Sequence, residues 1–432
     1  MTAPVPTRAS TLAEKIIARA SGREAVRPGE IVTARVDLAM MHDSGGPRRV
    51  APILEELGAR VWDPDRVLVV TDHYVPAVDA ESARILDLTR KWVREAGVRR
   101  FHDMRGICHV VAQEGGHLRP GMFVVGGDSH SPTGGAVGAF MFGVGATDMA
   151  GVLATGETWI RVPGTIRIVW TGALADGVCA KDMMLAACAR LGMGGGDYQV
   201  VEYAGDTIEA LSHPERMTLC NMAAELGAQT GIVAPDATTA AFLRKAGVDD
   251  IETAWCVTDP DADLLAEHAF SAVDLGPQVA APHSPANAAD VGEYAGEAID
   301  QAYIGACTGA KLEDLHMAAR VLKGRQVASG TRLLVAPAST AATATAAADG
   351  TLAALTEAGA ILMPTGCGAC AGYGAGVLAA GETCIASTAR NFKGRMGDPA
   401  SRVFLGSPFT VAASAIEGRI ADPRPFLEGA SS

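Results

Sequence analysis

Three cysteines stand where their sulfur atoms could hold a metal or carry out redox chemistry. Cys367 and Cys370 lie three residues apart between glycines in MPTGCGACAGYG, and Cys307 ends the segment AIDQAYIGAC. A C-x-x-C pair alone fits a zinc site, a dithiol redox centre or no site at all. The third cysteine favours a metal centre. An iron–sulfur cube held by only three thiolates would leave one iron open to a substrate, as Lewis-acid catalysis requires.

Polar side chains with acid, base or carboxylate-binding chemistry occur in several other segments. Arg390 and Arg395 in ARNFKGR offer planar guanidinium groups that match carboxylates. Asn221 and Glu225 in CNMAAE lie four residues apart, one helical turn, so they are expected to share a helix face. The remaining candidates, each near a predicted strand end or glycine-rich loop, are His42, Asp72, His73, His109, Asp128 and His130.

Parallel sheets are the elements that must bring these residues together. Short apolar strands are predicted to end near His42, at Asp72, at Cys307 and before Arg390, and AGAILMP before Cys367 is expected to be a buried strand. Amphipathic segments such as 79–97, opened by acids and closed by a glycine, predict helices between the strands. This order is typical of a doubly wound α/β fold, in which ligands bind outside the carboxyl ends of the strands.

Composition shifts predict three domains, spanning 1–165, 166–282 and 283–432. The Pro- and Ala-rich segment 276–296 is expected to be a linker before the last domain. We find no secretory signal and no apolar run long enough to cross a membrane, so a cytoplasmic protein is expected. A net charge of −13 and the absence of a basic run with aromatic residues argue against nucleic-acid binding.

The combined motifs resemble those of the aconitase superfamily, in particular its 3-isopropylmalate dehydratase and homoaconitase large-subunit branch. The segments that carry the resemblance, in the family's order, are TDHYVP, GICHVV, GGDSHSPTGGAVG, MTLCNMAAE, IGACTGAKLEDL, PTGCGACAGYG and STARNFKGRMGDP. The resemblance implies three aconitase-like α/β domains with doubly wound parallel sheets. It also implies a swivelling domain, which we expect on a separate small subunit because the sequence stops at Ser432.

The resemblance further implies a hydro-lyase that reversibly removes water from a hydroxy-diacid or hydroxy-triacid. Its implied cofactor is one 4Fe-4S cluster on Cys307, Cys367 and Cys370. Its implied catalytic residues are Asp72, His73, His109, Asp128, His130 and Glu225, and its implied substrate contacts are Arg390, Arg395, His42 and Asn221. The carbon-bound proton would be removed by a serine of the small subunit. Among its substrates, 3-isopropylmalate (leucine biosynthesis) is favoured, and homocitrate, citramalate and dimethylmalate stay open.

The motifs depart from the family pattern at a few positions. Ala306, Gly309 and Lys311 replace a serine, an asparagine and an arginine, and Val110 and Ala389 replace amide residues. These changes predict fewer hydrogen bonds around the cluster. They leave open a relative that senses a cluster or binds nucleic acid without catalysis, and a zinc or dithiol protein that uses Cys367 and Cys370 alone.

Overall fold

The computed structural model describes residues 9–428. Its first sheet contains the strands that lead to His42 and Asp72. Its five strands are all parallel and run in the order β4-β3-β2-β5-β6. Their bounds are β2 (Leu38–His42), β3 (Val67–Thr71), β4 (Arg100–Asp103), β5 (Phe123–Gly126) and β6 (Phe140–Gly143). A separate antiparallel ribbon pairs β1 (Ile31–Arg35) with β7 (Glu157–Arg161).

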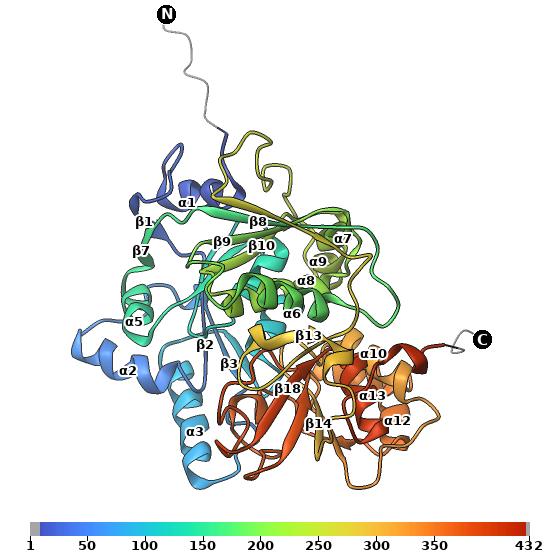
Figure 1. Ribbon diagram of the computed structural model, residues 1–432. Coiled ribbons are helices and arrows are strands. Elements are labelled where there is room, and N and C mark those ends of the chain that lie inside the picture. Colours follow the sequence, from blue (N-terminus) through green and yellow to red (C-terminus); the bar gives the residue numbers. More distant parts are fainter. Residues whose placement is uncertain (1–8, 429–432) are drawn as a thin grey trace, which may run out of the picture.

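The second sheet has four parallel strands in the order β10-β9-β8-β11. They are β8 (Thr165–Thr171), β9 (Val200–Ala204), β10 (Thr230–Val233) and β11 (Ala266–Ser271). In Figure 1 this sheet, largely green, lies above the blue first sheet and the orange-to-red third sheet.

The third sheet has seven strands in the order β13-β12-β18-β17-β14-β15-β16. They are β12 (Gln278–Ala280), β13 (Ala288–Asp290), β14 (Gln301–Ile304), β15 (Arg332–Val335), β16 (Ile361–Leu362), β17 (Thr383–Ala386) and β18 (Arg402–Gly406). Five strands are parallel, whereas β12 pairs antiparallel with both β13 and β18. The linker predicted at 276–296 is therefore wrong, because this segment contributes β12 and β13 to the edge of this sheet.

The helices that connect the strands begin and end largely at the expected signals. The helix predicted at 79–97 is confirmed as α3, since Asp79 Oδ1 accepts from the Ser82 N–H at 2.7 Å and Gly97 follows with a φ of 71°. The helices are α1 (Leu12–Ser21), α2 (Pro47–Glu56), α3 (Ala80–Glu95), α4 (Cys108–Glu114), α5 (Ala146–Thr155), α6 (Ala180–Leu191), α7 (Asp206–Ala210), α8 (His213–Met222), α9 (Ala237–Lys245), α10 (Leu312–Leu322), α11 (Thr340–Ala348), α12 (Thr351–Glu357) and α13 (Pro408–Glu417). The α/β fold class predicted from the sequence is confirmed.

Two topological switch points direct the site residues toward each other. In the first sheet the chain runs outward through β3 and β4 and returns to β5 on the other side of β2. In the third sheet it runs from β14 through β15 and β16 and returns to β17 on the other side of β14. Ligands of such sheets bind at the carboxyl ends beside the switch point. His42 ends β2, and Cys307 and Arg390 follow β14 and β17.

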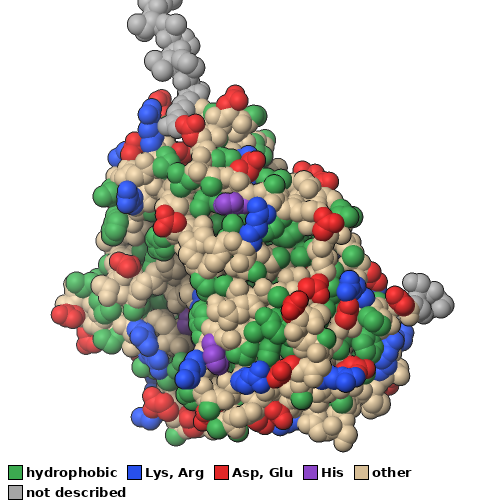
Figure 2. Space-filling model, in the orientation of Figure 1, with side chains coloured by type: hydrophobic (Ala, Val, Ile, Leu, Met, Phe, Trp, Pro, Cys, Tyr) green, Lys and Arg blue, Asp and Glu red, His purple; other side chains and the backbone are tan. Residues whose placement is uncertain are grey.

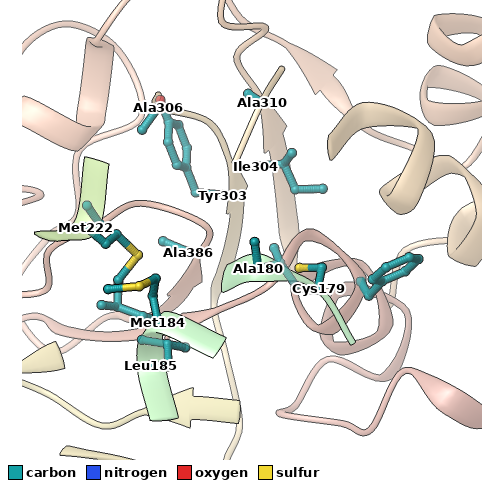
Figure 3. Close-up of a cluster of buried hydrophobic side chains, with 14 of the residues drawn as sticks. Cys179, Ala180, Met184, Leu185, Met222, Tyr303, Ile304, Ala306, Ala310 and Ala386 are labelled. Atoms are coloured by element: carbon teal, nitrogen blue, oxygen red, sulfur yellow. The ribbon is translucent and has the colours of Figure 1, made fainter. Parts of the chain in front are cut away.

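One hydrophobic core joins the second and third sheets. Met184 and Leu185 of α6 belong to the same buried cluster as Tyr303 and Ile304 of β14 and Ala386 of β17 (Figure 3). Burial of this apolar surface fixes the distance between α6 and the carboxyl ends of the third sheet. The three domain ranges expected from the sequence stay predictions.

The structure differs from the expected elements at two places near the site. The strand before Cys367 is only β16, an edge strand whose Ile361 and Leu362 are 51% and 44% exposed, so the prediction of a buried strand is wrong. Helix α8 ends at Met222, and Glu225 lies on a following 3₁₀ turn instead of the same α-helix as Asn221.

The surface is hollowed between the upper and lower parts of the face drawn in Figure 2, and histidine side chains are visible at the hollow. Basic side chains gather below it. Within residues 9–428, none of the helices combines the length and apolar character needed to cross a bilayer.

Candidate active site

A buried group of two histidines and two aspartates lies at the ends of β2 and β3. His73 Nδ1 lies 2.7 Å from Asp72 Oδ1, and the His42 ring stacks on the His73 ring with centroids 4.2 Å apart. Asp43 accepts the backbone N–H groups of His73 at 3.0 Å and Tyr74 at 2.9 Å, which fixes the loop after β3. The carboxylates therefore hold His73 in one orientation.

Electrostatics make His73 a protonated side chain. Although burial lowers its pKa, the charge and hydrogen bond of Asp72 raise the pKa of His73 to about 9. For Asp72, burial raises the pKa, but His73 outweighs it and lowers that pKa to about 2. The pair can present an imidazolium to a bound molecule.

A second polar group joins the first sheet to the second. His109 of α4 has Nε2 2.8 Å from Asp128 Oδ1, and this carboxylate also accepts the His130 N–H at 2.7 Å. His130 Nε2 lies 3.2 Å from Glu225 Oε1. Burial opposes ionisation of Asp128, yet the hydrogen bond and charge of His109 hold its pKa well below the usual range.

The arginines after β17 are held separately. Arg390 Nε donates to Glu225 Oε1 at 2.6 Å and its Nη1 donates to Ser129 Oγ at 2.8 Å. Arg395 instead hydrogen-bonds Cys370. The two guanidinium groups thus reach the site from different sides, one through the carboxylate network and one through the cysteine turn.

The three cysteines come together at the carboxyl end of the third sheet. Asn221 Nδ2 donates to Cys307 Sγ at 3.0 Å, and the Cys367 N–H donates to the Asp72 carbonyl at 2.8 Å, so the cysteine loops contact α8 and the loop after β3. A hydrogen bond from Cys367 lowers the pKa of Cys370 to about 6, and Arg395 favours its thiolate further. A thiolate is the form that binds metal.

The cysteine arrangement fits an iron–sulfur cluster better than a single zinc ion. Sulfur ligands of one zinc ion lie about 2.3 Å from the metal and hence within about 4.6 Å of one another. Among residues 9–428, the groups whose ligand atoms all lie within 4.8 Å of one another consist of His and Asp, and the cysteine triplet is not one of them. The three sulfur atoms therefore do not all lie as close together as one zinc ion requires, whereas a cube of several irons accommodates a longer separation.

Unpaired polar atoms around the cysteines support the same fit. In the described part of the chain, eleven buried side-chain nitrogen and oxygen atoms have no hydrogen-bond partner. Five of them belong to residues at this site, namely His109 Nδ1, Asn221 Oδ1, Glu225 Oε2, Tyr303 Oη and Arg395 Nε. Since buried polar groups are normally paired, their concentration here indicates that a polar group binds among them.

Lys181 is a residue of this region that sequence reasoning missed. It is 1% exposed at the start of α6, and its Nζ donates to the Thr388 carbonyl at 2.5 Å, two residues before Arg390. Burial lowers its pKa to about 8, although the charge of Glu225 acts against this. The feature of the sequence that could have indicated it is a single lysine in the largely apolar segment VCAKDMML.

Side chains at and near the departing positions make hydrogen bonds around the Cys307 loop, and the expectation of fewer bonds than in the family stays a prediction. Lys311 Nζ donates to Asp314 Oδ2 at 2.7 Å, Thr218 Oγ1 at 3.0 Å and the Cys307 carbonyl at 3.3 Å. A Cβ atom at Gly309 would collide with Ser387, whose Oγ accepts from the Gly305 N–H at 3.0 Å. Lysine and serine side chains therefore hold the Cys307 loop in this chain.

A buried hydrogen-bond chain fixes the helices behind the site. His213, the first residue of α8, has Nε2 2.7 Å from Gln113 Oε1, and Gln113 Nε2 donates to the Thr133 carbonyl at 2.6 Å. Thr133 Oγ1 accepts from Asn221 Nδ2 at 2.8 Å. The chain links α4, which carries His109, to α8, which carries Asn221.

His213 is expected to make the folded protein less stable in acid. Burial lowers its pKa to about 3 from an ordinary value of 6.5. The folded state then binds fewer protons than the unfolded state, so the contribution is complete above pH 6.5 and is lost as the pH falls toward 3. His213→Asn keeps a donor for Gln113 but cannot titrate. Its urea midpoint should fall less than that of wild type between roughly pH 7.5 and 5.5, and parallel curves would contradict this role.

A cavity of about 280 Å³ opens beside His73. Its walls include Tyr74, Val75, Met363 and Tyr373, and the Tyr74 and Tyr373 rings lie 4.8 Å apart. Apolar walls next to a proton donor are suitable for an organic acid with an alkyl side chain.

Comparison with known proteins places this geometry in context. The chain matches the model of the aconitase family (aconitate hydratase) over residues 14–298 and 291–418. It is 50% identical over 420 residues to the 3-isopropylmalate dehydratase large subunit 1 of Methanopyrus kandleri, covering 96% of this chain and 99% of that protein.

Two further matches are a relative with a different name and a solved structure of much lower sequence identity. The probable methanogen homoaconitase large subunit of Methanothermobacter thermautotrophicus is 46% identical over 418 residues, covering 96% of this chain and 97% of that protein. The crystal structure of Thermococcus kodakaraensis aconitase X is similar with a TM-score of 0.51 at 15% identity, covering 85% of this chain and 88% of that one. This structural likeness concerns the fold alone.

Proposed function

This chain belongs to the aconitase family, and from that premise we propose that it is the large subunit of a 3-isopropylmalate dehydratase. Such a hydro-lyase removes water from a hydroxy-diacid and returns it at the neighbouring carbon. The observation that carries the proposal is the identity of 50%, across nearly the full length of both chains, with a relative of that name. The convergence of acid–base groups, arginines and thiols at two switch points supports it.

We propose that Cys307, Cys367 and Cys370 hold one 4Fe-4S cluster. When bound, such a cluster supplies an open iron that acts as a Lewis acid toward the substrate hydroxyl and carboxylate. The buried thiols, the lowered pKa of Cys370 and the unpaired polar atoms nearby support this assignment.

His73 is proposed to give a proton to the departing hydroxide. Its Nδ1 is engaged by Asp72 at 2.7 Å, so the proton available for transfer is the one on Nε2. Asp72 favours the imidazolium by its charge, and Asp43 fixes the backbone that carries both residues. General acid catalysis of this kind contributes roughly 10²- to 10⁴-fold.

Arg390 and Arg395 are proposed to bind the carboxylates of the substrate. Glu225 holds Arg390 through Nε and Ser129 accepts from its Nη1, which leaves Nη2 and the second N–H of Nη1 to bind an acid. His42, His109, Asp128, His130 and Asn221 complete the proposed polar lining.

We further propose that the serine that removes the carbon-bound proton comes from a separate small subunit. The relative from Methanopyrus kandleri is itself named a large subunit and matches this chain over 99% of its length. Homoaconitase is the second candidate, because the probable methanogen homoaconitase large subunit of Methanothermobacter thermautotrophicus is 46% identical.

The test is an anaerobic assay of the reconstituted chain, alone and mixed with a dehydratase small subunit. The mixture is expected to convert 3-isopropylmalate to its unsaturated acid faster than homocitrate, citramalate or dimethylmalate, and the chain alone to show no turnover. Faster reaction of homocitrate would favour the second candidate. Turnover by the chain alone would overturn the requirement for a small subunit.

A further inference from the structure

We infer that the hydroxyl of Tyr303 donates a hydrogen bond to a cluster sulfur or a ligand thiolate at the Cys367–Cys370 turn, and thereby makes the cluster harder to oxidise. The inference rests on the proposed function, because it requires the cluster. Tyr303, which also lines the cavity beside His73, is a positioning residue in this account, since it acts through sulfur.

The ring of Tyr303 is packed against the loop that carries Cys307. Tyr303 lies on β14 and is 1% exposed. A Cβ atom at Gly305 would collide with its ring and hydroxyl, so the ring can lie there only because residue 305 has no side chain. In Figure 3 the ring extends from β14 toward the segment of Ala306.

The hydroxyl end of this ring lies at the second cysteine loop. A Cβ atom at Gly368, between Cys367 and Cys370, would lie 3.5 Å from the Tyr303 oxygen. That oxygen is shielded from solvent and has no hydrogen-bond partner among the described residues. A buried hydroxyl without a partner calls for a group that the protein side chains do not supply.

The chemistry of the hydroxyl and of its surroundings agrees with a sulfur acceptor. A phenol has an ordinary pKa of about 10 and therefore keeps its proton at neutral pH. Thiolates and sulfides can only accept hydrogen bonds. The unpaired donor therefore faces the part of the site where acceptor-only sulfur atoms would lie.

The chain offers a matched control in Tyr203 of β9. Tyr203 is also buried, at 2% exposure, and its hydroxyl also has no partner among the described residues. Its pKa is raised by burial and then by Cys220 and Cys188, which are not among the proposed cluster ligands. Replacing either tyrosine by phenylalanine removes the same atom and keeps the ring.

A hydrogen bond to a cluster sulfur stabilises the more negative, reduced state and raises the reduction potential. We expect wild type, Tyr303→Phe and Tyr203→Phe, reconstituted anaerobically, to bind about four irons each. Tyr303→Phe should have a lower midpoint potential in a one-electron titration followed by electron paramagnetic resonance. It should also lose its visible absorption roughly two- to tenfold faster when ferricyanide takes one electron from the cluster.

Tyr203→Phe should match wild type in both measurements. A Tyr303→Phe protein with a full cluster and an unchanged potential would overturn the inference while leaving the proposed function intact. Wild-type chain that binds no iron and sulfide would overturn both, so the iron assay separates the two failures.

Discussion

Replacement of Cys307 by alanine is expected to abolish iron–sulfur binding. After anaerobic reconstitution, wild type should contain about four irons and four sulfides per chain, and Cys307→Ala less than one of each. The reason is that Cys307 is the only proposed ligand on the loop after β14, and two thiolates on a single turn cannot hold a cube open at one iron. Iron and acid-labile sulfide analysis with the visible spectrum measures this, and dehydratase activity should be lost in parallel.

The matched control is Cys384→Ala. Cys384 is fully buried in β17, which pairs directly with β14, so its replacement removes a thiol of the same sheet at a similar packing cost. It should retain the full iron content. Retention of the cluster by Cys307→Ala would exclude Cys307 as a ligand, whereas zinc or no metal in wild type and in Cys307→Ala would support the zinc or dithiol alternative at Cys367 and Cys370.

Sequence reasoning predicted the strand ends well because their signals are local. The apolar runs before His42, Asp72 and Cys307 are short and bounded by polar or glycine residues, and the structure ends β2, β3 and β14 at or just before them. A polar residue at the end of a buried parallel strand is readable without knowledge of the neighbouring strands.

The order of strands could not be read in the same way. The pairing of β2 with β5, and of β14 with β17, joins segments that are distant in sequence, and it is this pairing that creates the two switch points. The apolar run before Cys367 was misread for a related reason. Whether Ile361 is covered depends on its position at the sheet edge, which no local pattern encodes.

The sequence also could not predict which distant side chains contact the loops that carry the site residues. Gly309 looked like the loss of an amide, but the space at residue 309 is taken by Ser387 from β17's carboxyl end. Lys181 reaches the Thr388 carbonyl from a helix of the second domain range. In both cases the partner is more than 70 residues away in the chain, so only the packed structure reveals the pair.

Asp72→Asn is expected to lower kcat by roughly 10²- to 10⁴-fold while leaving the cluster content unchanged. Asparagine has nearly the same shape, and its oxygen can still accept the Cys108 N–H that Asp72 Oδ2 accepts at 2.7 Å. It lacks the negative charge that, against the effect of burial, raises the pKa of His73 to about 9. Steady-state rates of the large and small subunit complex, measured as a function of pH, test this.

The pH profile separates loss of the proton donor from a general disturbance. In wild type the rate should fall as His73 loses its proton near pH 9, and in Asp72→Asn that fall should begin at lower pH because the imidazolium is less stable. Asp103→Asn is the matched control, since Asp103 ends the adjacent strand β4 and pairs with Arg90 at 2.8 Å outside the site. It should change kcat by less than about threefold, in line with a partly exposed ion pair. Equal rates and equal pH profiles for Asp72→Asn and wild type would overturn the role of Asp72 in favouring the imidazolium of His73.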